Sequence, residues 1–296
     1  MKIIDRILII ANLFIILLSA CGGQPVPPSP TPTPSPTISP TLTAIPSTPT
    51  STPGPAGLCA NVLNPFLPDA RWVYATTGVT NPWSVEVTVK GVEQLANNVA
   101  HIRIRDVNEV WVIEDNTICH QGALQNFPLI FTSMLLSDYM NGVLNTYHVS
   151  GVYSPSYETL VDYNWSYSWD LAEMLEDEVA VTQSAVPNSV YMTKLMNITV
   201  HSEILPEREA VSVPAGAFPQ ALKVLQEIKL PVSVWTASSS MSGEITLRIT
   251  QWYEPYVGLL KMQVDSASIS FVVGMEVPIT MGSAITLTEF DPGKLP

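Results

Sequence analysis

Short runs of alternating apolar and polar residues dominate the chain beyond residue 58. In one run Val85, Val87 and Val89 alternate with charged and hydroxyl-bearing residues. The same period recurs at Ile102 and Ile104, and at Ile245, Leu247 and Ile249. Because successive side chains of a strand point to opposite faces, this period predicts strands with one buried face.

A further run places four large side chains on one predicted face: Trp165, Tyr167, Trp169 and Leu171. Turns are predicted at 214–216 and 255–258, where Gly216 and Gly258 follow proline and allow the chain to re-enter the sheet. Helix is scarce, with the best candidates at Phe131 to Met140 and Glu173 to Glu178. The pattern predicts a mainly all-β domain: a curved antiparallel sheet, half-barrel or sandwich, with little helix.

The first 20 residues have the composition of a signal peptide. Lys2 and Arg6 precede an apolar run over residues 7–18, which Ser19 and Ala20 follow. The run is too short for a permanent membrane-spanning helix, which needs about 20 apolar residues. With Cys21 next, residues 18–21 resemble the lipobox of bacterial lipoproteins. That resemblance implies lipid on Cys21, an extracytoplasmic location and the membrane as a partner; the alternative is a signal peptide that merely contains a cysteine.

Residues 21–57 are rich in Pro, Thr and Ser and carry no charge. Such a segment has too little apolar surface to form a core and favours extended geometry, so it is predicted to be a disordered tether. A plain spacer is favoured over an O-glycosylated stalk, for which the composition is permissive.

Residues 58–296 form the predicted β domain, either as one large unit or as two smaller ones. The formal net charge of the chain is −13 at pH 7. This charge argues against nucleic acid as a partner. Cys59 and Cys119 are the cysteines beyond the lipobox, and an even pair in an oxidising compartment predicts a disulfide. Two buried thiols are the alternative, whereas a metal site at Cys119 and His120 lacks the usual ligand spacing.

An internal echo links two parts of the domain. Trp72 and Tyr74 follow Asp69 with the spacing D-x-x-W-x-Y, and Trp165 and Tyr167 follow Asp162 with the same spacing. Two related halves, residues 58–155 and 156–296, would explain the echo. Chance, given the frequency of aromatic residues in strands, is the alternative. Trp72 and Trp252 are predicted to fill the core rather than to stack on a ligand.

Three segments resemble a broad class of bacterial envelope lipoproteins of undefined function: residues 64–74, residues 211–224 and residues 252–261. The class has the pattern P-x-G-x-x-W-x-Y, then V-P-A-G-T-F-x-A-L-K-V, then W-Y-A-P-x-V-G-L-V-K. This chain departs from it at Asp69, Ala217 and Glu254. The resemblance implies a strongly curved antiparallel sheet, loosely similar to the LolA and LolB half-barrels, without implying that the chain carries lipids.

Sequence motifs for catalysis are absent: the chain has no HExxH, P-loop, GxGxxG, GxSxG or EF-hand pattern. Glu173 and the acidic residues 176–178 are interpreted as a solvated face rather than a Ca²⁺ site, and no metal or cofactor is expected. The first functional hypothesis is a non-catalytic, lipid-anchored protein that binds a protein partner or a hydrophobic ligand. A structural or assembly factor of the cell surface and a hydrolase with a dispersed site are the alternatives.

Overall fold

The computed structural model describes residues 59–293, apart from 81, 95–96, 109, 137–139, 142–143, 145, 176–179, 182–189, 192–196, 237–238, 273 and 280. Cys21, the tether and the leader lie outside these residues. Within the described part of the chain, no helix has the length and apolar character needed to cross a bilayer.

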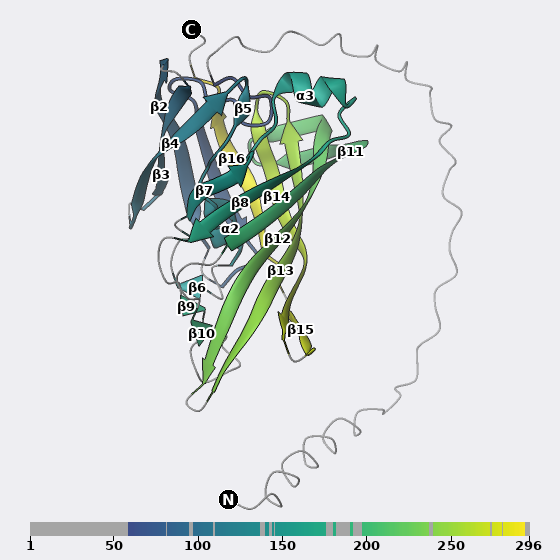
Figure 1. The fold of residues 1–296 in the computed structure, drawn as a ribbon. Coiled ribbons are helices and arrows are strands. Elements are labelled where there is room, and N and C mark those ends of the chain that lie inside the picture. Colours follow the sequence, from purple (N-terminus) through teal and green to yellow (C-terminus); the bar gives the residue numbers. More distant parts are fainter. Residues whose placement is uncertain are drawn as a thin grey trace, which may run out of the picture. The chain divides into compact units, whose positions relative to one another are not determined.

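Sixteen strands of the described chain form one antiparallel sheet (Figure 1). They are β1 (Arg71–Thr77), β2 (Ser84–Gln94), β3 (Asn98–Asp106), β4 (Val112–His120), β5 (Ala123–Leu124), β6 (Met140–Asn141), β7 (Thr146–Gly151), β8 (Ser168–Leu175), β9 (Ala180–Val181), β10 (Val190–Tyr191), β11 (Asn197–Val213), β12 (Gly216–Thr236), β13 (Ser239–Glu254), β14 (Gly258–Phe271), β15 (Glu276–Ile279) and β16 (Ala284–Asp291). Two short helices, α2 (Ile130–Leu135) and α3 (Tyr157–Asp162), accompany them. The predicted fold class, a curved antiparallel sheet with little helix, is confirmed.

The sheet branches at its longest strands. One path runs β5-β4-β3-β2-β1-β16-β14-β13-β12, and from β12 a branch continues through β11 and β8 to β7. The two ends of this path meet at one point, where Leu124 of β5 forms a bridge with Ser154, just beyond β7. The sheet therefore curves far enough for its ends to touch.

Alternation along the strands makes one face of the sheet apolar and buried. In β8, Trp169, Leu171 and Leu175 are buried, as the period-two pattern predicted. Helix α2 lies against this inner face: all six of its residues are buried, and Phe131 packs edge-on against Tyr74 of β1 with ring centroids 4.8 Å apart. Four of these residues are apolar, and the buried Ser133 hydroxyl donates to the Leu129 carbonyl, so the helix suits the interior.

The segment preceding β1 fastens the two ends of the sheet together. Cys59 and Cys119 form a disulfide, with Cα atoms 5.4 Å apart. Asn61, which is 1% exposed, donates hydrogen bonds to the carbonyl oxygens of Gly122 and Pro155, each at 2.8 Å. Its own side-chain oxygen accepts from the Ser154 hydroxyl. This one amide thus ties the β5 end of the sheet to the chain beyond β7.

Several predicted structural residues lie where expected. Trp72 and Tyr74 are buried in β1, and the Trp72 indole donates to the Val257 carbonyl at 2.6 Å. Trp252 is buried in β13, with the ammonium groups of Lys223 and Lys261 over its ring. The predicted turns at 214–216 and 255–258 are hairpin connections, the second with Gly258 at φ +108°.

The strand predicted at Trp165 and Tyr167 is wrong. Strand β8 begins only at Ser168, and Trp165 lies half-buried in the turn after α3 with φ +59°. Ser156 caps α3 by accepting from the Thr159 amide, and Glu158 adds favourable charge to its first turn, so this stretch forms a helix first. The helix closes with the Trp165 amide donating to the Leu160 carbonyl at 2.7 Å.

The two D-x-x-W-x-Y motifs consequently occupy different structures. Asp69 lies in a turn before β1, whereas Asp162 is the last residue of α3. The shared spacing therefore gives no support to related halves at residues 58–155 and 156–296.

The helix predictions were partly wrong as well. The first candidate is helical only over Ile130–Leu135 and ends before the predicted Met140. In the second, Glu173 lies in β8, and residues 176–178 lie outside the described residues. Glu173 is buried in step with the apolar residues before it on β8. The acidic residues after it in the sequence had suggested a helix instead.

Candidate functional site

A cavity opens where the curved sheet fails to close. In the described chain, the edge of β4 before Cys119 and the outer edge of β7 carry no partner strand. A cavity of about 630 Å³ lies between them. Its lining residues are Trp111, Val112, Ile113, Glu114, Asp115, Asn126, Phe127, Pro128, Thr146, Tyr147, His148 and Glu173. This volume is in the range of cavities that hold small organic ligands.

Glu173 is the deepest charged group of this β4–β7 cavity. It belongs to the inner, apolar face of β8, in step with Trp169 and Leu171, and is 1% exposed. The hydroxyl of Thr146 donates to one of its carboxyl oxygens. Burial raises the pKa of Glu173 to about 7, with the nearby charge of Asp115 adding to the rise and the Thr146 hydrogen bond opposing it.

His148 lies directly across from Glu173 in the β7–β8 ladder. Opposed residues of a strand pair share a face, so the imidazole and the carboxyl line the same side of the sheet. Burial lowers the pKa of His148, and its Nδ1 is buried without a hydrogen-bond partner among the described residues. Burial thus disfavours the charged form of the imidazole beside the acidic groups of the cavity.

Aromatic side chains form the rest of the wall. Phe127 is buried and packs against Tyr153 and Phe131, which fixes its ring. Trp111 packs against Trp83 with ring centroids 6.0 Å apart. Tyr147 is 43% exposed, and its hydroxyl contacts Met174 on the outer face of β8. The cavity thus combines rigid apolar surface with a few polar groups, as small-molecule sites do.

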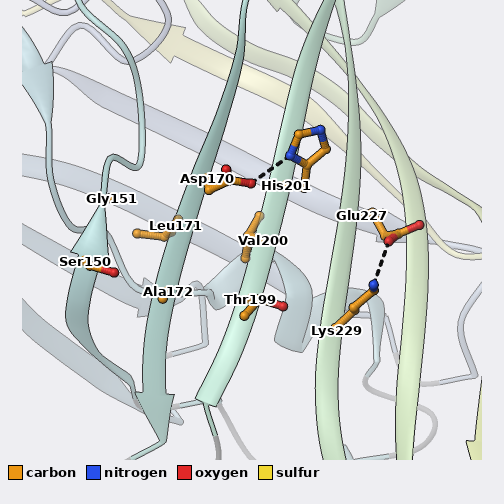
Figure 2. Close-up of a pocket in the computed structure, with 10 residues that line it drawn as sticks. All are labelled: Ser150, Gly151, Asp170, Leu171, Ala172, Thr199, Val200, His201, Glu227 and Lys229. Carbon is orange, nitrogen blue, oxygen red and sulfur yellow. Dashed lines mark hydrogen bonds and ion pairs between the residues drawn. The ribbon is translucent and has the colours of Figure 1, made fainter.

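A second hollow, of about 320 Å³, lies on the opposite face of the same strands (Figure 2). Here His201 of β11 faces Asp170 of β8, with its Nδ1 2.7 Å from a carboxylate oxygen. Glu227 is paired with Lys229 at 3.3 Å. Figure 2 shows these charged groups directed at one another rather than at a shared centre. This outer groove is a set of mutually satisfied surface pairs.

Neither the β4–β7 cavity nor the outer groove, as far as the described residues go, contains a set of metal ligands. Among the described residues, no group of three or more His, Cys, Asp or Glu side chains is arranged to hold an ion. A hydrolase would require a histidine and a carboxylate that converge on a nucleophile, and the described lining of the β4–β7 cavity contains no serine. The hydroxyl of Thr146, which is in this lining, donates to Glu173.

The residues singled out from the sequence do not line the β4–β7 cavity. Trp72, Tyr74, Trp252, Gly216 and Gly258 belong to strands and turns elsewhere, while Trp165 and Tyr167 flank the end of α3. Sequence reasoning missed Glu173 and His148 as site residues. One signal was present: Glu173 falls on the apolar half of an alternating run, where a carboxylate is out of place.

Comparison with known proteins finds structural similarity without a family. No family model matches the chain, and no curated protein matches. A protein of Bacteroides fragilis described as exported, with a YmcC-like fold, is 13% identical over 78% of this chain and 99% of its own, with a TM-score of 0.44. A chain of Parabacteroides distasonis described as a lipoprotein is 16% identical over the same shares, with a TM-score of 0.42. Neither description mentions LolA or LolB, and similarity at this level does not identify a function.

Proposed function

We propose that this chain is a non-catalytic, lipid-anchored extracytoplasmic protein that binds a small organic ligand in the β4–β7 cavity. One observation carries the proposal: a cavity of about 630 Å³ with aromatic walls and a buried carboxyl group opens at the seam of the sheet. Elsewhere on the inner face, helix α2 is packed with all six of its residues buried. The unfilled space at the seam is of the size that a small ligand needs.

The anchor is supported by the leader and by the disulfide. Lipid on Cys21 follows from the resemblance to the lipobox, and residues 21–57 would hold the β domain away from the membrane. A Cys59–Cys119 disulfide suits an oxidising compartment. Cys21→Ala is expected to abolish incorporation of a palmitate analogue. Equal labelling of this variant and the native chain would refute the anchor.

Ligand binding is tested with the neutral, apolar fluorophore N-phenyl-1-naphthylamine. The processed chain is titrated in phosphatidylcholine nanodiscs beside two variants. Ile113→Trp fills the β4–β7 cavity, whereas Thr199→Trp adds the same ring to the outer groove. All three proteins are placed in nanodiscs of the same composition. The fluorescence of dye dissolved in the lipid is therefore the same in each titration.

We expect the native chain and Thr199→Trp to enhance the fluorescence equally, and Ile113→Trp to lose most of that enhancement. Equal signals from all three proteins would show that the dye does not use the β4–β7 cavity. Loss with Thr199→Trp alone would move the site to the outer groove.

A further inference from the structure

The charges around the β4–β7 cavity are of one sign. Asp115 and Glu173 lie on its inner side, whereas Glu114 alternates with Asp115 and faces outward. No lysine or arginine is among its described lining residues. The basic side chain among these lining residues, His148, has its pKa lowered by burial. The potential inside is therefore negative, and the formal net charge of −13 for the whole chain reinforces it.

Among the described residues, Glu173 forms no ion pair. The hydroxyl of Thr146 donates a hydrogen bond to it, and burial lowers the pKa of the opposed His148. Burying a carboxyl group without a cation is costly, and such groups are retained mainly where they act on something else. A ligand that brings a positive charge would supply the partner that the fold leaves out.

The aromatic walls favour the same kind of ligand. Trp111 and Phe127 line the cavity together with the carboxyl groups. Aromatic faces attract cations through the ring quadrupole while also burying apolar surface. An anionic ligand such as a fatty acid would meet like charge at Asp115 and Glu173.

We propose that the β4–β7 cavity selects a ligand with a protonated amine attached to an apolar body, the amine lying between Glu173 and Asp115 and the body against the aromatic wall. This inference rests on the proposed function and adds the chemical class of the ligand. It excludes carboxylates and phosphates as preferred ligands of this site.

The test compares three probes that share one apolar body and differ in head group: 4-phenylbutylamine, 4-phenylbutan-1-ol and 4-phenylbutyrate. Each is titrated by calorimetry at pH 8 into the processed chain in phosphatidylcholine nanodiscs, with Ile113→Trp as the blocked reference. The amine is expected to bind roughly 10- to 100-fold more tightly than the alcohol, the range for a hydrogen bond to a charged group. The carboxylate is expected to bind most weakly.

Glu173→Gln keeps the size of the side chain and an acceptor for Thr146 but removes the charge. It is expected to remove most of the preference for the amine while leaving the affinity for the alcohol unchanged. Asp170→Asn is the matched control, because Asp170 lies on the same strand but on the outer face. Asp115→Asn is a second variant, expected to weaken amine binding without affecting the buried face of β8.

The outcomes separate the two proposals. Alcohol and amine binding equally, both blocked by Ile113→Trp, would overturn the amine preference and leave the ligand cavity standing. Tightest binding of the carboxylate would also overturn it. An amine preference that survives both Glu173→Gln and Asp115→Asn would place the cation elsewhere, and no binding of any probe would overturn the cavity itself.

Discussion

Strand β8 carries two histidine–carboxylate pairs, one on each face of the sheet. On the outer face Asp170 opposes His201 of β11, and on the inner face Glu173 opposes His148 of β7. The outer pair is in contact and largely exposed, with 83% of the Asp170 side chain accessible. Glu173 is 1% exposed and accepts a hydrogen bond from the hydroxyl of Thr146.

The difference between the pairs shows how burial decides what the same residue types do. In water, an exposed pair gains little and is screened by salt, so it marks no site. On the dry face, the carboxyl keeps its proton to higher pH, and burial disfavours the charged form of the imidazole. The carboxyl and imidazole of the inner pair thus line a cavity without forming an ion pair with each other. In the outer pair, His201 and Asp170 are in direct contact.

The largest effect is expected from releasing the seam that forms the cavity. Cys59→Ala with Cys119→Ala removes the crosslink over a loop of 60 residues. In the chain-entropy model this lowers the free energy of unfolding by about 4 kcal/mol. Denaturant unfolding followed by tryptophan fluorescence measures it, and the dye enhancement assigned to the cavity should fall as well. An unchanged midpoint would mean that the disulfide does not hold the seam.

The next largest effect is the dependence of stability on pH that the buried carboxyl group of Glu173 is expected to cause. The pKa of Glu173 is raised to about 7 in the folded chain from 4.5. Its contribution to stability is therefore fully present below pH 4.5 and is lost as the pH rises through 7. The loss approaches about 3 kcal/mol at pH 8. The groups facing it are Thr146 and His148 on β7 and Asp115 on β4.

Glu173→Gln has no such titration and is expected to be more stable than the native chain at pH 8, by up to that amount, and equally stable near pH 4. Thermal unfolding across this range gives the comparison. Asp170→Asn should follow the native curve. If Glu173→Gln followed it as well, Glu173 would not be the group that burial perturbs.

The seam can also be opened at a single amide. Asn61→Ala removes the bonds to Gly122 and Pro155 and leaves both carbonyl oxygens unpaired. Loss of these buried bonds is expected to lower the free energy of unfolding by about 2 kcal/mol. Asn116→Ala serves as the control, since that amide contacts His101 in an exposed position on β4. Hydrogen exchange at the Leu124 and Tyr153 amides should accelerate in Asn61→Ala alone.

The sequence predicted the sheet because its signal is local. Apolar residues two positions apart, as at Val85, Val87 and Val89, predict a strand. The same spacing predicts which of its side chains are buried. The cap at Ser156 is local too, but the aromatic residues after it suggested a strand. The chain is helical there because Ser156 caps the first turn and Glu158 adds favourable charge to it.

The β4–β7 cavity could not be predicted from the sequence, because its position depends on which strand edges remain unpaired. Nothing near Asp115 in the sequence indicates that β4 keeps a free edge opposite β7, about 30 residues further on. That arrangement is set by the Leu124–Ser154 bridge and by Asn61. Glu173 was misread for a related reason: it begins an acidic stretch, and only the packing of β8 shows that its side chain points inward.

The smallest effect is expected at the outer pair, Asp170 and His201. Measuring it tests whether exposure accounts for the difference between the outer and the inner pair. A double-mutant cycle with Asp170→Asn and His201→Ala should give a coupling energy below about 1 kcal/mol, the usual limit for exposed ion pairs, and smaller still at 0.5 M salt. Unfolding of the four proteins at pH 6, in low and high salt, measures it. A salt-insensitive coupling well above that limit would mean that the outer groove is held as rigidly as the inner cavity. Exposure would then no longer explain why two histidine–carboxylate pairs on one strand behave differently, and the outer groove would have to be considered a site in its own right.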